Sequence, residues 1–335
     1  MDKINIKILA KELNLSTSTI SRAFNGSTDI NKDTRDRILA VAREHSFLPN
    51  HYASNLRDKK TKTLAVIVPE IANDFFAQAI NGIEEVARKH GFYILLYRTD
   101  DVFEKEVSFV NYLNNGKADG IIMSVSGEGN DHKYLDNLRQ KNIPVVFFDR
   151  VYEDIDAPKV TTNDYDSSFA ATEQLLQTGC RKIAYLVVNK SISIGKTRMQ
   201  GYVDALAKHK VPFIDELVID CSNDEKVNTK ILTKVLKDIK PDGIFSSVER
   251  LAFATYHVCN TLGVSIPNDL KLISFSSLGI APLLSPALST ITQPAFEMGV
   301  KAATLFFEAL ENKDVDMPKK HHVLKSKLFI RRSSE

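Results

Sequence analysis

The chain has 335 residues, 43% of them hydrophobic, which is enough for a large core divided among two or three domains. Its net charge is only +2, and its three widely separated cysteines exclude a disulfide framework and a cysteine-based metal site. No apolar leader-like segment and no run of about 18 apolar residues occurs, so we expect a cytoplasmic protein without a membrane span.

The positive charge is concentrated near the N-terminal end. Residues 1–60 contain 11 Lys and Arg against 7 Asp and Glu, a net charge of +4, whereas the remaining residues carry 33 against 35. A DNA-binding module neutralises phosphates with such an excess, although a chance fluctuation of surface charge would give the same count.

Residues 5–25 have the pattern of two short helices joined by a tight turn. Asn5 can cap the first helix, Ser16 can cap the second, and Asn14 stands in the turn, where a residue tolerant of positive φ is needed. The second helix would present Thr17, Ser18, Ser21 and Arg22 to solvent. This is either a helix-turn-helix that contacts phosphates and base edges in a major groove, or an ordinary helical hairpin with a hydroxyl-rich surface.

A third helix should pack against the first two. Asn31 can cap it, and Thr34, Ile38, Val41 and Ala42 form one stripe at helical spacing. Three short helices of this kind can bury one another, so we expect a small unit with its own core.

Residues 51–62 form a basic linker. Pro49 disfavours helix at the residue before it, and Asn50 can cap about two helical turns, too few to be stable alone in water. Ala53 and Leu56 would share one face of such a helix as an apolar wedge for a minor groove. The segment is therefore either a helix that orders on DNA or a flexible basic tether.

From residue 63 onward, continuous apolar runs alternate with helical stretches. Uninterrupted apolarity indicates strands buried on both faces of a parallel sheet, with crossover helices between them. Two series of runs predict two doubly wound lobes, with ligands bound where the strands end. The predicted strands are 64–68, 93–97, 120–124 and 145–148 in the first series, 183–188, 243–246 and 272–275 in the second, and a last strand at 328–333.

Over nearly its whole length, the chain resembles the lactose-repressor/galactose-repressor family of bacterial transcription regulators. The motifs that carry this resemblance are the segment from Ser16 to Asn25, Leu48-Pro49-Asn50, Leu56-Arg57, Ile67-Val68-Pro69, Asn73-Asp74-Phe75-Phe76, Gly82-Ile83-Glu84, Asp119-Gly120-Ile121-Ile122, Phe148-Asp149-Arg150, Arg198-Met199-Gln200-Gly201-Tyr202 and Thr290-Ile291-Thr292-Gln293-Pro294. The implied fold is an all-α helix-turn-helix headpiece followed by a two-lobed, doubly wound parallel-sheet core of periplasmic-binding-protein type.

The resemblance also implies the domain boundaries. They are a DNA-binding headpiece at residues 1–48, a hinge helix or linker at 49–61, a regulatory N-subdomain at 62–161 and 292–322, and a regulatory C-subdomain at 162–291 and 323–335. The helices near residues 75–90 and 250–262 are candidate dimer surfaces.

The family resemblance implies a sequence-specific regulator, expected to be a repressor, that binds a roughly palindromic double-stranded operator as a homodimer. The second helix would lie in the major groove, and paired hinge helices would lie in the minor groove with Leu56 as the intercalating wedge. The residues implied to contact DNA are Ser16, Thr17, Ser18, Thr19, Ser21, Arg22, Asn25, Asn50, Ala53 and Leu56.

A small-molecule effector, a sugar or a sugar derivative, would bind between the lobes. The residues implied to contact it are Asn73, Asp74, Phe75, Phe76, Ser124, Asp149, Arg150, Asn163, Asp164, Arg198, Ser276 and Gln293. Structural roles compete with this interpretation, because Asp149 and Arg150 could form an ion pair that only steadies a loop and Phe76 could belong to the core.

Two segments depart from the family pattern. The chain has Val248-Glu249 where the family usually has Asn-Asp, and Ser276 where a carboxylate often binds sugar hydroxyls. The effector is therefore either a less hydroxylated, acidic or phosphorylated compound that Arg198 contacts, or a sugar bound through other groups. Induction, co-repression and activation are all compatible with this scheme, since an effector shifts an equilibrium toward the form it binds better.

Two other classes of protein share parts of this pattern. An enzyme of doubly wound fold is disfavoured, because no Gly-x-Gly-x-x-Gly, phosphate loop or nucleophile elbow is present, and no catalytic residue or cofactor is expected. His321 and His322 lie in an expected polar loop without partners at helical spacing, so we predict no metal site. A transport-associated binding protein would need an export signal where the helix-turn-helix stands.

Overall fold

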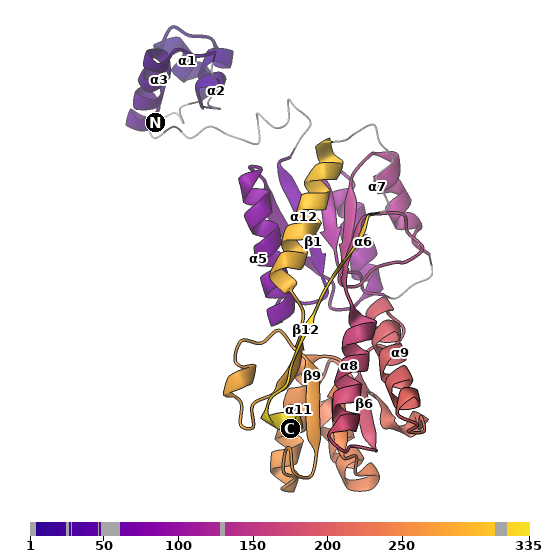
Figure 1. Cartoon of the computed structure of the whole chain (residues 1–335). Coiled ribbons are helices and arrows are strands. Elements are labelled where there is room, and N and C mark those ends of the chain that lie inside the picture. The colour runs from indigo at the N-terminus through magenta and orange to yellow at the C-terminus, as the bar shows by residue number, and fades with distance from the viewer. Residues whose placement is uncertain are drawn as a thin grey trace. The chain divides into compact units, whose positions relative to one another are not determined.

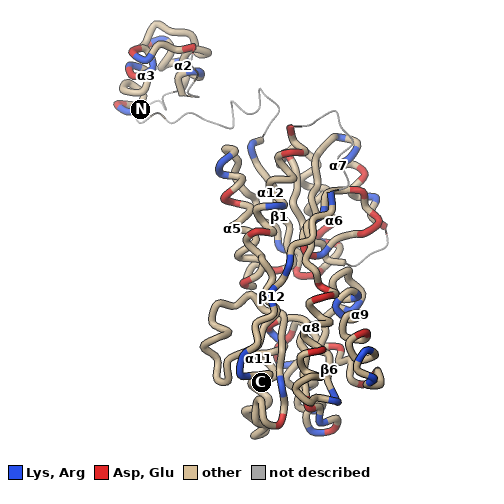
Figure 2. The backbone as a smooth tube through the Cα atoms, viewed as in Figure 1, with Lys and Arg blue, Asp and Glu red and all other residues tan. Residues whose placement is uncertain are grey.

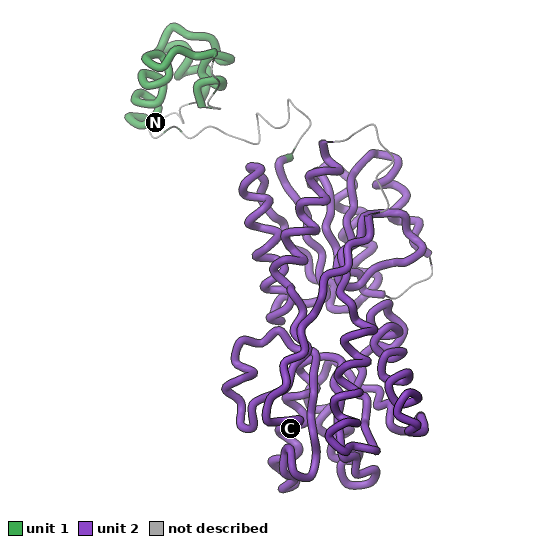
Figure 3. Tube along the Cα trace, viewed as in Figure 1, with its two compact units in different colours: residues 1–61 green, residues 62–335 purple. Residues whose placement is uncertain are grey.

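The computed structural model describes residues 5–24, 27, 29–45, 47, 61–127, 131–311 and 320–335. The chain divides into two compact units, residues 1–61 and residues 62–335 (Figure 3). In these described ranges, no helix is both long and apolar enough to cross a membrane.

Three helices form the first unit, the headpiece: α1 (Ile6–Glu12), α2 (Thr17–Phe24) and α3 (Lys32–Glu44). The predicted caps are present. The Asn5 side chain accepts hydrogen bonds from the backbone N–H groups of the first turn of α1, the Ser16 hydroxyl oxygen accepts one from Thr19 N–H at 3.0 Å, and Asn31 accepts one from Asp33 N–H at 3.0 Å. These bonds satisfy backbone donors that have no partner inside a helix.

The headpiece core lies where the three helices meet. Asn14, in the turn between α1 and α2, has a φ of +53°, as its place in the sequence predicts. The Arg37 guanidinium donates a hydrogen bond to the carbonyl of Leu13 at 2.7 Å and so ties α3 to the same turn. The fully buried apolar residues are Leu9, Ala10, Leu13, Ile20, Ala23, Ile38 and Ala42.

Two six-stranded sheets form the framework of the second unit, one in each lobe (Figure 1). The sheet of the first lobe is wholly parallel, with the spatial order β11-β5-β4-β3-β1-β2. Its strands are β1 (Thr63–Val68), β2 (Tyr93–Arg98), β3 (Gly120–Met123), β4 (Val145–Phe148), β5 (Lys159–Thr162) and β11 (His321–Leu324). Its helices are α5 (Asp74–Lys89), α6 (Phe103–Leu113), the 3₁₀ turn Lys133–Leu135, α7 (Asp136–Gln140) and α12 (Ala295–Glu311).

The sheet of the second lobe has the order β12-β10-β9-β8-β6-β7, and only β12 is antiparallel to its neighbour. Its strands are β6 (Ile183–Val187), β7 (Val218–Asp220), β8 (Gly243–Ser246), β9 (Lys271–Phe275), β10 (Ser289–Thr292) and β12 (Lys327–Phe329). Its helices are α8 (Asp164–Gln177), α9 (Ser193–Lys208), α10 (Glu225–Lys234) with the π-helical turn Val235–Ile239, α11 (Glu249–Leu262), and the 3₁₀ turns Asp215–Leu217, Ala281–Leu283 and Arg332–Ser334.

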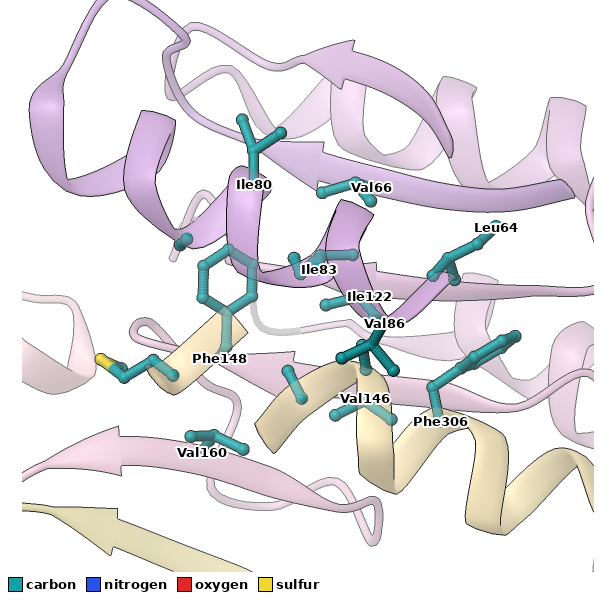
Figure 4. Close-up of a cluster of buried hydrophobic side chains, with 14 of the residues drawn as sticks. Leu64, Val66, Ile80, Ile83, Val86, Ile122, Val146, Phe148, Val160 and Phe306 are labelled. Atoms are coloured by element: carbon teal, nitrogen blue, oxygen red, sulfur yellow. The ribbon is translucent and has the colours of Figure 1, made fainter. Parts of the chain in front are cut away.

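Successive residues of each central strand enter different cores, because side chains alternate across a sheet. In the first lobe, Leu64, Val66 and Phe148 pack under α5 and α12, as Figure 4 shows, whereas Ala65 and Ile67 pack on the opposite face. The second lobe repeats this arrangement, with α10 and α11 on one face and α8 and α9 on the other. The predicted two-lobed α/β fold with both sheet faces covered is confirmed.

The structure corrects three sequence predictions. Strand β2 is an edge strand in which Tyr93, Leu95 and Leu96 are exposed, because the helices cover the sheet edge only in part; Ile94 and Tyr97 are half-buried against the two cores. The last strand ends at Phe329, and the chain then forms a 3₁₀ turn, where Ser333 bonds to neighbouring strands. His321 and His322 lie in strand β11 and not in a loop, since pairing with β5 supplies backbone hydrogen bonds that local sequence does not reveal.

The chain passes between the two lobes three times. The passages join β5 to α8, β10 to α12, and β11 to β12. All three leave strands at the same side of the sheets, since β5 and β11 lie at one edge of the first sheet and β10 and β12 at one edge of the second. Residues that end the central strands therefore face the junction between the lobes.

Candidate functional site

A buried ion pair lies at the junction of the lobes. Arg198 in α9 and Asp164 at the start of α8 approach to 2.6 Å between Nε and Oδ1, and each side chain is only 4% exposed. The Nη1 atom of Arg198 donates to the carbonyl of Ser247 at 2.7 Å, and the guanidinium carbon lies 3.6 Å from the centre of the Phe275 ring. Among the described residues, Nη2 of Arg198 donates to no protein atom, so it can still bind an oxygen of another molecule.

Hydrogen bonds connect this ion pair with the first lobe. The Thr162 hydroxyl donates to Asp164 Oδ2 at 2.9 Å, and the Gln293 side-chain amide donates to Thr162 Oγ1 at 3.1 Å. The same amide and the hydroxyl of Ser124 reach the two carboxylate oxygens of Asp149 at 3.5 Å each. Bonds of this length are weak, so ligand hydroxyl groups can replace them at little cost.

Asp149 is the carboxylate of the junction with the most altered acidity. It is 4% exposed, and its backbone has a φ of +60° directly after β4. Burial raises the pKa of its carboxyl to about 6, although Arg150 and Arg198 act in the opposite direction; the Asp164 charge adds to the rise. The carboxyl therefore keeps its proton to a higher pH than an ordinary aspartate, and in its protonated form it can donate as well as accept a hydrogen bond.

Four predicted site residues follow β1, at the N-terminus of α5. The Asn73 side chain caps the helix, accepting hydrogen bonds from the N–H groups of Phe75 at 3.0 Å and Phe76 at 3.3 Å. Phe75 and Phe76 are 8% and 3% exposed, and Phe76 packs edge-on against Phe148 with ring centres 6.2 Å apart. Both rings belong to the core of the first lobe, and Asp74 lies half-buried in the same first turn.

Two other predicted residues have partners away from the Arg198 cluster. Arg150 forms an ion pair with Asp101 and not with Asp149, which excludes the proposed ion pair between neighbours. The Asn163 side-chain oxygen accepts a hydrogen bond from Ser326 N–H at 2.8 Å and so joins two of the passages between the lobes. The structure thus brings together Ser124, Asp149, Asp164, Arg198 and Gln293.

Ser276 has a carboxylate partner that the sequence did not predict. Its hydroxyl donates to Glu249 Oε2 at 3.0 Å, and burial raises the pKa of Glu249. Thr162, Ser247 and Phe275 are further contacts of the cluster that the sequence analysis missed. For Ser247 and Phe275 the available signal was position, because they directly follow or end a strand predicted from its apolar run, whereas Thr162 ends strand β5, which the sequence did not predict.

The headpiece presents the predicted polar surface on α2. Ser16, Thr17, Ser18 and Arg22 are exposed, whereas Thr19 and Ser21 are half-buried. Acidic and basic residues follow one another closely along α3 (Figure 2), and two of its arginines bond to backbone carbonyls within the headpiece. Asn25, Asn50, Ala53 and Leu56 lie outside the described residues, so the hinge helix and its wedge stay predictions.

Comparisons with known proteins match both units of the chain. Residues 5–50 match the family of bacterial regulatory proteins named lacI, and residues 61–329 match the periplasmic binding proteins and sugar-binding domain of that family. The catabolite control protein A of Priestia megaterium is 28% identical over 316 residues, which cover 93% of this chain and 94% of that protein.

Solved structures show the same fold. The Lac repressor dimer bound to operator and the anti-inducer ONPF has a TM-score of 0.86 at 18% identity, with 99% of each chain covered. A LacI family transcriptional regulator from Enterococcus faecium with bound ribose has a TM-score of 0.73 at 25% identity, with 81% of this chain and 98% of that chain covered. The chain belongs to the lacI family of bacterial regulatory proteins, and it is a DNA-binding transcriptional regulator.

Proposed function

We propose that the chain is a repressor that binds a roughly palindromic operator as a homodimer and responds to a sugar or sugar derivative held between its lobes. The polar cluster around Arg198 is the observation that carries this proposal. Buried polar groups are costly unless they are paired, and this cluster contains long hydrogen bonds and an Nη2 atom available to an added oxygen. Its residues come from both lobes, so a ligand there would contact both.

The charges at the junction favour a neutral polyol over an anion. Arg198 is already paired with Asp164, and Arg150 with Asp101. By contrast, Asp149 and Glu249 have no ion-pair partner within the described part of the chain. Since an anionic effector would meet unpaired carboxylates, this arrangement supports the sugar alternative and weighs against the acidic or phosphorylated effector considered from the sequence.

The proposed DNA contacts are the exposed hydroxyls and the guanidinium of α2. Hydroxyls, which donate and accept, suit both phosphates and base edges, and Arg22 can bind a guanine through two hydrogen bonds. The predicted contacts of Asn25, Asn50, Ala53 and Leu56 complete the proposal. It also places the protein in the cytoplasm and gives it no catalytic step.

A second copy of the chain is the proposed occupant of the exposed edge strand β2. Tyr93 is 75% exposed, and Leu95 and Leu96 are each 37% exposed, which is unusual for consecutive apolar residues of a strand. A single headpiece offers a small contact area for a specific DNA site. Two copies related by a twofold axis would cover the exposed strand β2 and would also double the contact area on DNA. The helices α5 and α11 stay the other proposed surfaces.

Calorimetric titration of the full chain tests the effector site. The panel contains neutral pentoses and hexoses, uronates and sugar phosphates, each measured with the unmodified chain and with Arg198→Lys. We expect one neutral sugar to bind, with at least tenfold weaker binding to the variant. Strong binding of uronates or phosphates alone would contradict the assignment of a neutral effector.

Selection of bound sites from random duplex tests the DNA-binding part. We expect a palindromic consensus and an affinity that falls steeply as salt rises, because phosphate contacts release counterions. A transport-associated binding protein would share the sugar site but bind no duplex, so absence of any selected sequence would overturn the proposal.

A further inference from the structure

A second polar network joins the two lobes, separate from the Arg198 cluster. Arg250, in the first turn of α11, pairs through Nη2 with Glu70 of the first lobe and donates through Nη1 to Asn223 Oδ1 at 2.7 Å. The side-chain amide of Asn223 in turn donates to Asp101 Oδ2 at 3.1 Å, and Asp101 pairs with Arg150. We call these five residues the clasp.

One end of the clasp, the contact between Asn223 and Asp101, lies on the side of the lobes opposite to the chain passages. Asp101 follows β2, which is one edge of the first sheet, and Asn223 follows β7, which is one edge of the second. The three passages leave from the other edges, at β5, β11, β10 and β12. Asp149 and Ser247 directly follow the central strands β4 and β8, so the Arg198 cluster lies between the passages and the Asn223–Asp101 end of the clasp.

We propose that the clasp is a latch that stabilises the closed arrangement of the lobes, and that the effector enters or leaves when the clasp opens. The passages are covalent and act as the hinge, so rotation about them separates the clasp residues most. Two contacts of the clasp cross between the lobes, Arg250 with Glu70 and Asn223 with Asp101. Breaking these two contacts removes what the clasp itself contributes between the lobes. Two other hydrogen bonds also cross, from the Gln78 amide to the Ser277 carbonyl at 3.1 Å and from Val151 N–H to the Ser193 hydroxyl at 3.2 Å.

The contacts of the clasp are weak enough to break and form again reversibly. Arg250 and Glu70 are each 29% exposed, and Asn223 lies at the surface, so water can replace every one of these bonds when the lobes separate. An ion pair of this exposure is weak, and its loss should raise the ratio of open to closed molecules by about two- to fivefold. A fully buried pair such as Arg198 with Asp164 could not open so readily.

Spin-label distance measurements on the full chain test this inference. Labels on Glu104→Cys in α6 and Lys226→Cys in α10 report the separation of the lobes, since both residues are exposed and lie in different lobes. The three native cysteines are buried. We expect Arg250→Gln and Asn223→Ala each to raise the ratio of the longer-distance to the shorter-distance population by about two- to fivefold over the unmodified chain. The double variant Glu70→Arg with Arg250→Glu should bring this ratio back toward that of the unmodified chain.

The control is Lys190→Gln, which breaks an ion pair with Asp220 at 3.0 Å that lies wholly within the second lobe. It should leave the distances unchanged. The inference is overturned if Arg250→Gln and Asn223→Ala both keep the distances of the unmodified chain, or if the charge-reversed pair is as open as Arg250→Gln. The measurement needs no effector, so its result is independent of whether the proposed sugar binds.

Discussion

Replacing Arg198 by methionine tests the buried ion pair most sharply. Methionine keeps much of the length of the side chain but leaves Asp164, 4% exposed, without its cation. Removal of one partner of a buried pair costs about 3–5 kcal/mol, because the remaining charge is desolvated. The hydrogen bond from Thr162 to Asp164 offsets part of this cost, whereas the bond to the Ser247 carbonyl is lost as well. We expect the free energy of unfolding to fall by about 3–4 kcal/mol.

Urea unfolding followed by far-ultraviolet circular dichroism is the assay, since the chain contains no tryptophan. The double variant Arg198→Met with Asp164→Asn removes both charges and should regain at least half of the loss. Lys190→Gln, whose ion pair is more than half exposed at both partners, should cost less than about 1 kcal/mol. A loss below about 1 kcal/mol for Arg198→Met, or no recovery in the double variant, would show that the unpaired Asp164 carries no such desolvation cost.

Three further predictions concern packing, acidity and DNA. In Gly299→Ala, the added Cβ would lie 2.0 Å from the Ala79 carbonyl oxygen, so we expect the free energy of unfolding in urea to fall by about 1–3 kcal/mol. The control Gly279→Ala should change it little, because a Cβ there has no neighbour within 4 Å. Burial raises the pKa of Asp149 from 3.8 to about 6, so between these pH values the folded chain binds more protons than the unfolded chain. The free energy of unfolding should therefore fall by about 3 kcal/mol from this group as pH rises through this range. Asp149→Asn should abolish this contribution when unfolding is measured across pH. In fluorescence anisotropy, Arg22→Ala should reduce the difference in binding free energy between operator and random duplex by about 1–3 kcal/mol. Leu56→Ala should weaken operator binding more than random-duplex binding. Equal losses of affinity on both duplexes would count against these contacts.

The fold was predictable where local pattern and tertiary structure agree. The apolar runs at β1, β4 and β8 gave strands within one residue of their observed bounds, because these strands are covered on both faces. Strand β5 escaped prediction, since its threonines and lysine lack apolar character and its pairing comes from β4 and β11. The exposure of β2 was also missed, because covering by helices depends on neighbours distant in sequence.

Only some residues of the candidate cluster, and none of their pairings, were predictable from the sequence. Arg198 and Asp149 were identified through family motifs, yet the partner of Arg150 is 49 residues away and no spacing rule connects them. Glu249 was noted only as a departure from the family pattern, whereas its carboxylate bonds to Ser276. Contacts of this kind arise when separate loops meet at a junction, so only three-dimensional structure reveals them.

We propose that a ligand between the lobes controls how tightly two headpieces bind DNA. Operator anisotropy with the full chain at one salt concentration, titrated with the sugar that calorimetry identifies, tests this control. We predict that this sugar changes operator affinity at least tenfold, and that Arg198→Lys retains operator binding without sugar but loses the response. An operator affinity that the bound sugar leaves unchanged would contradict the claim.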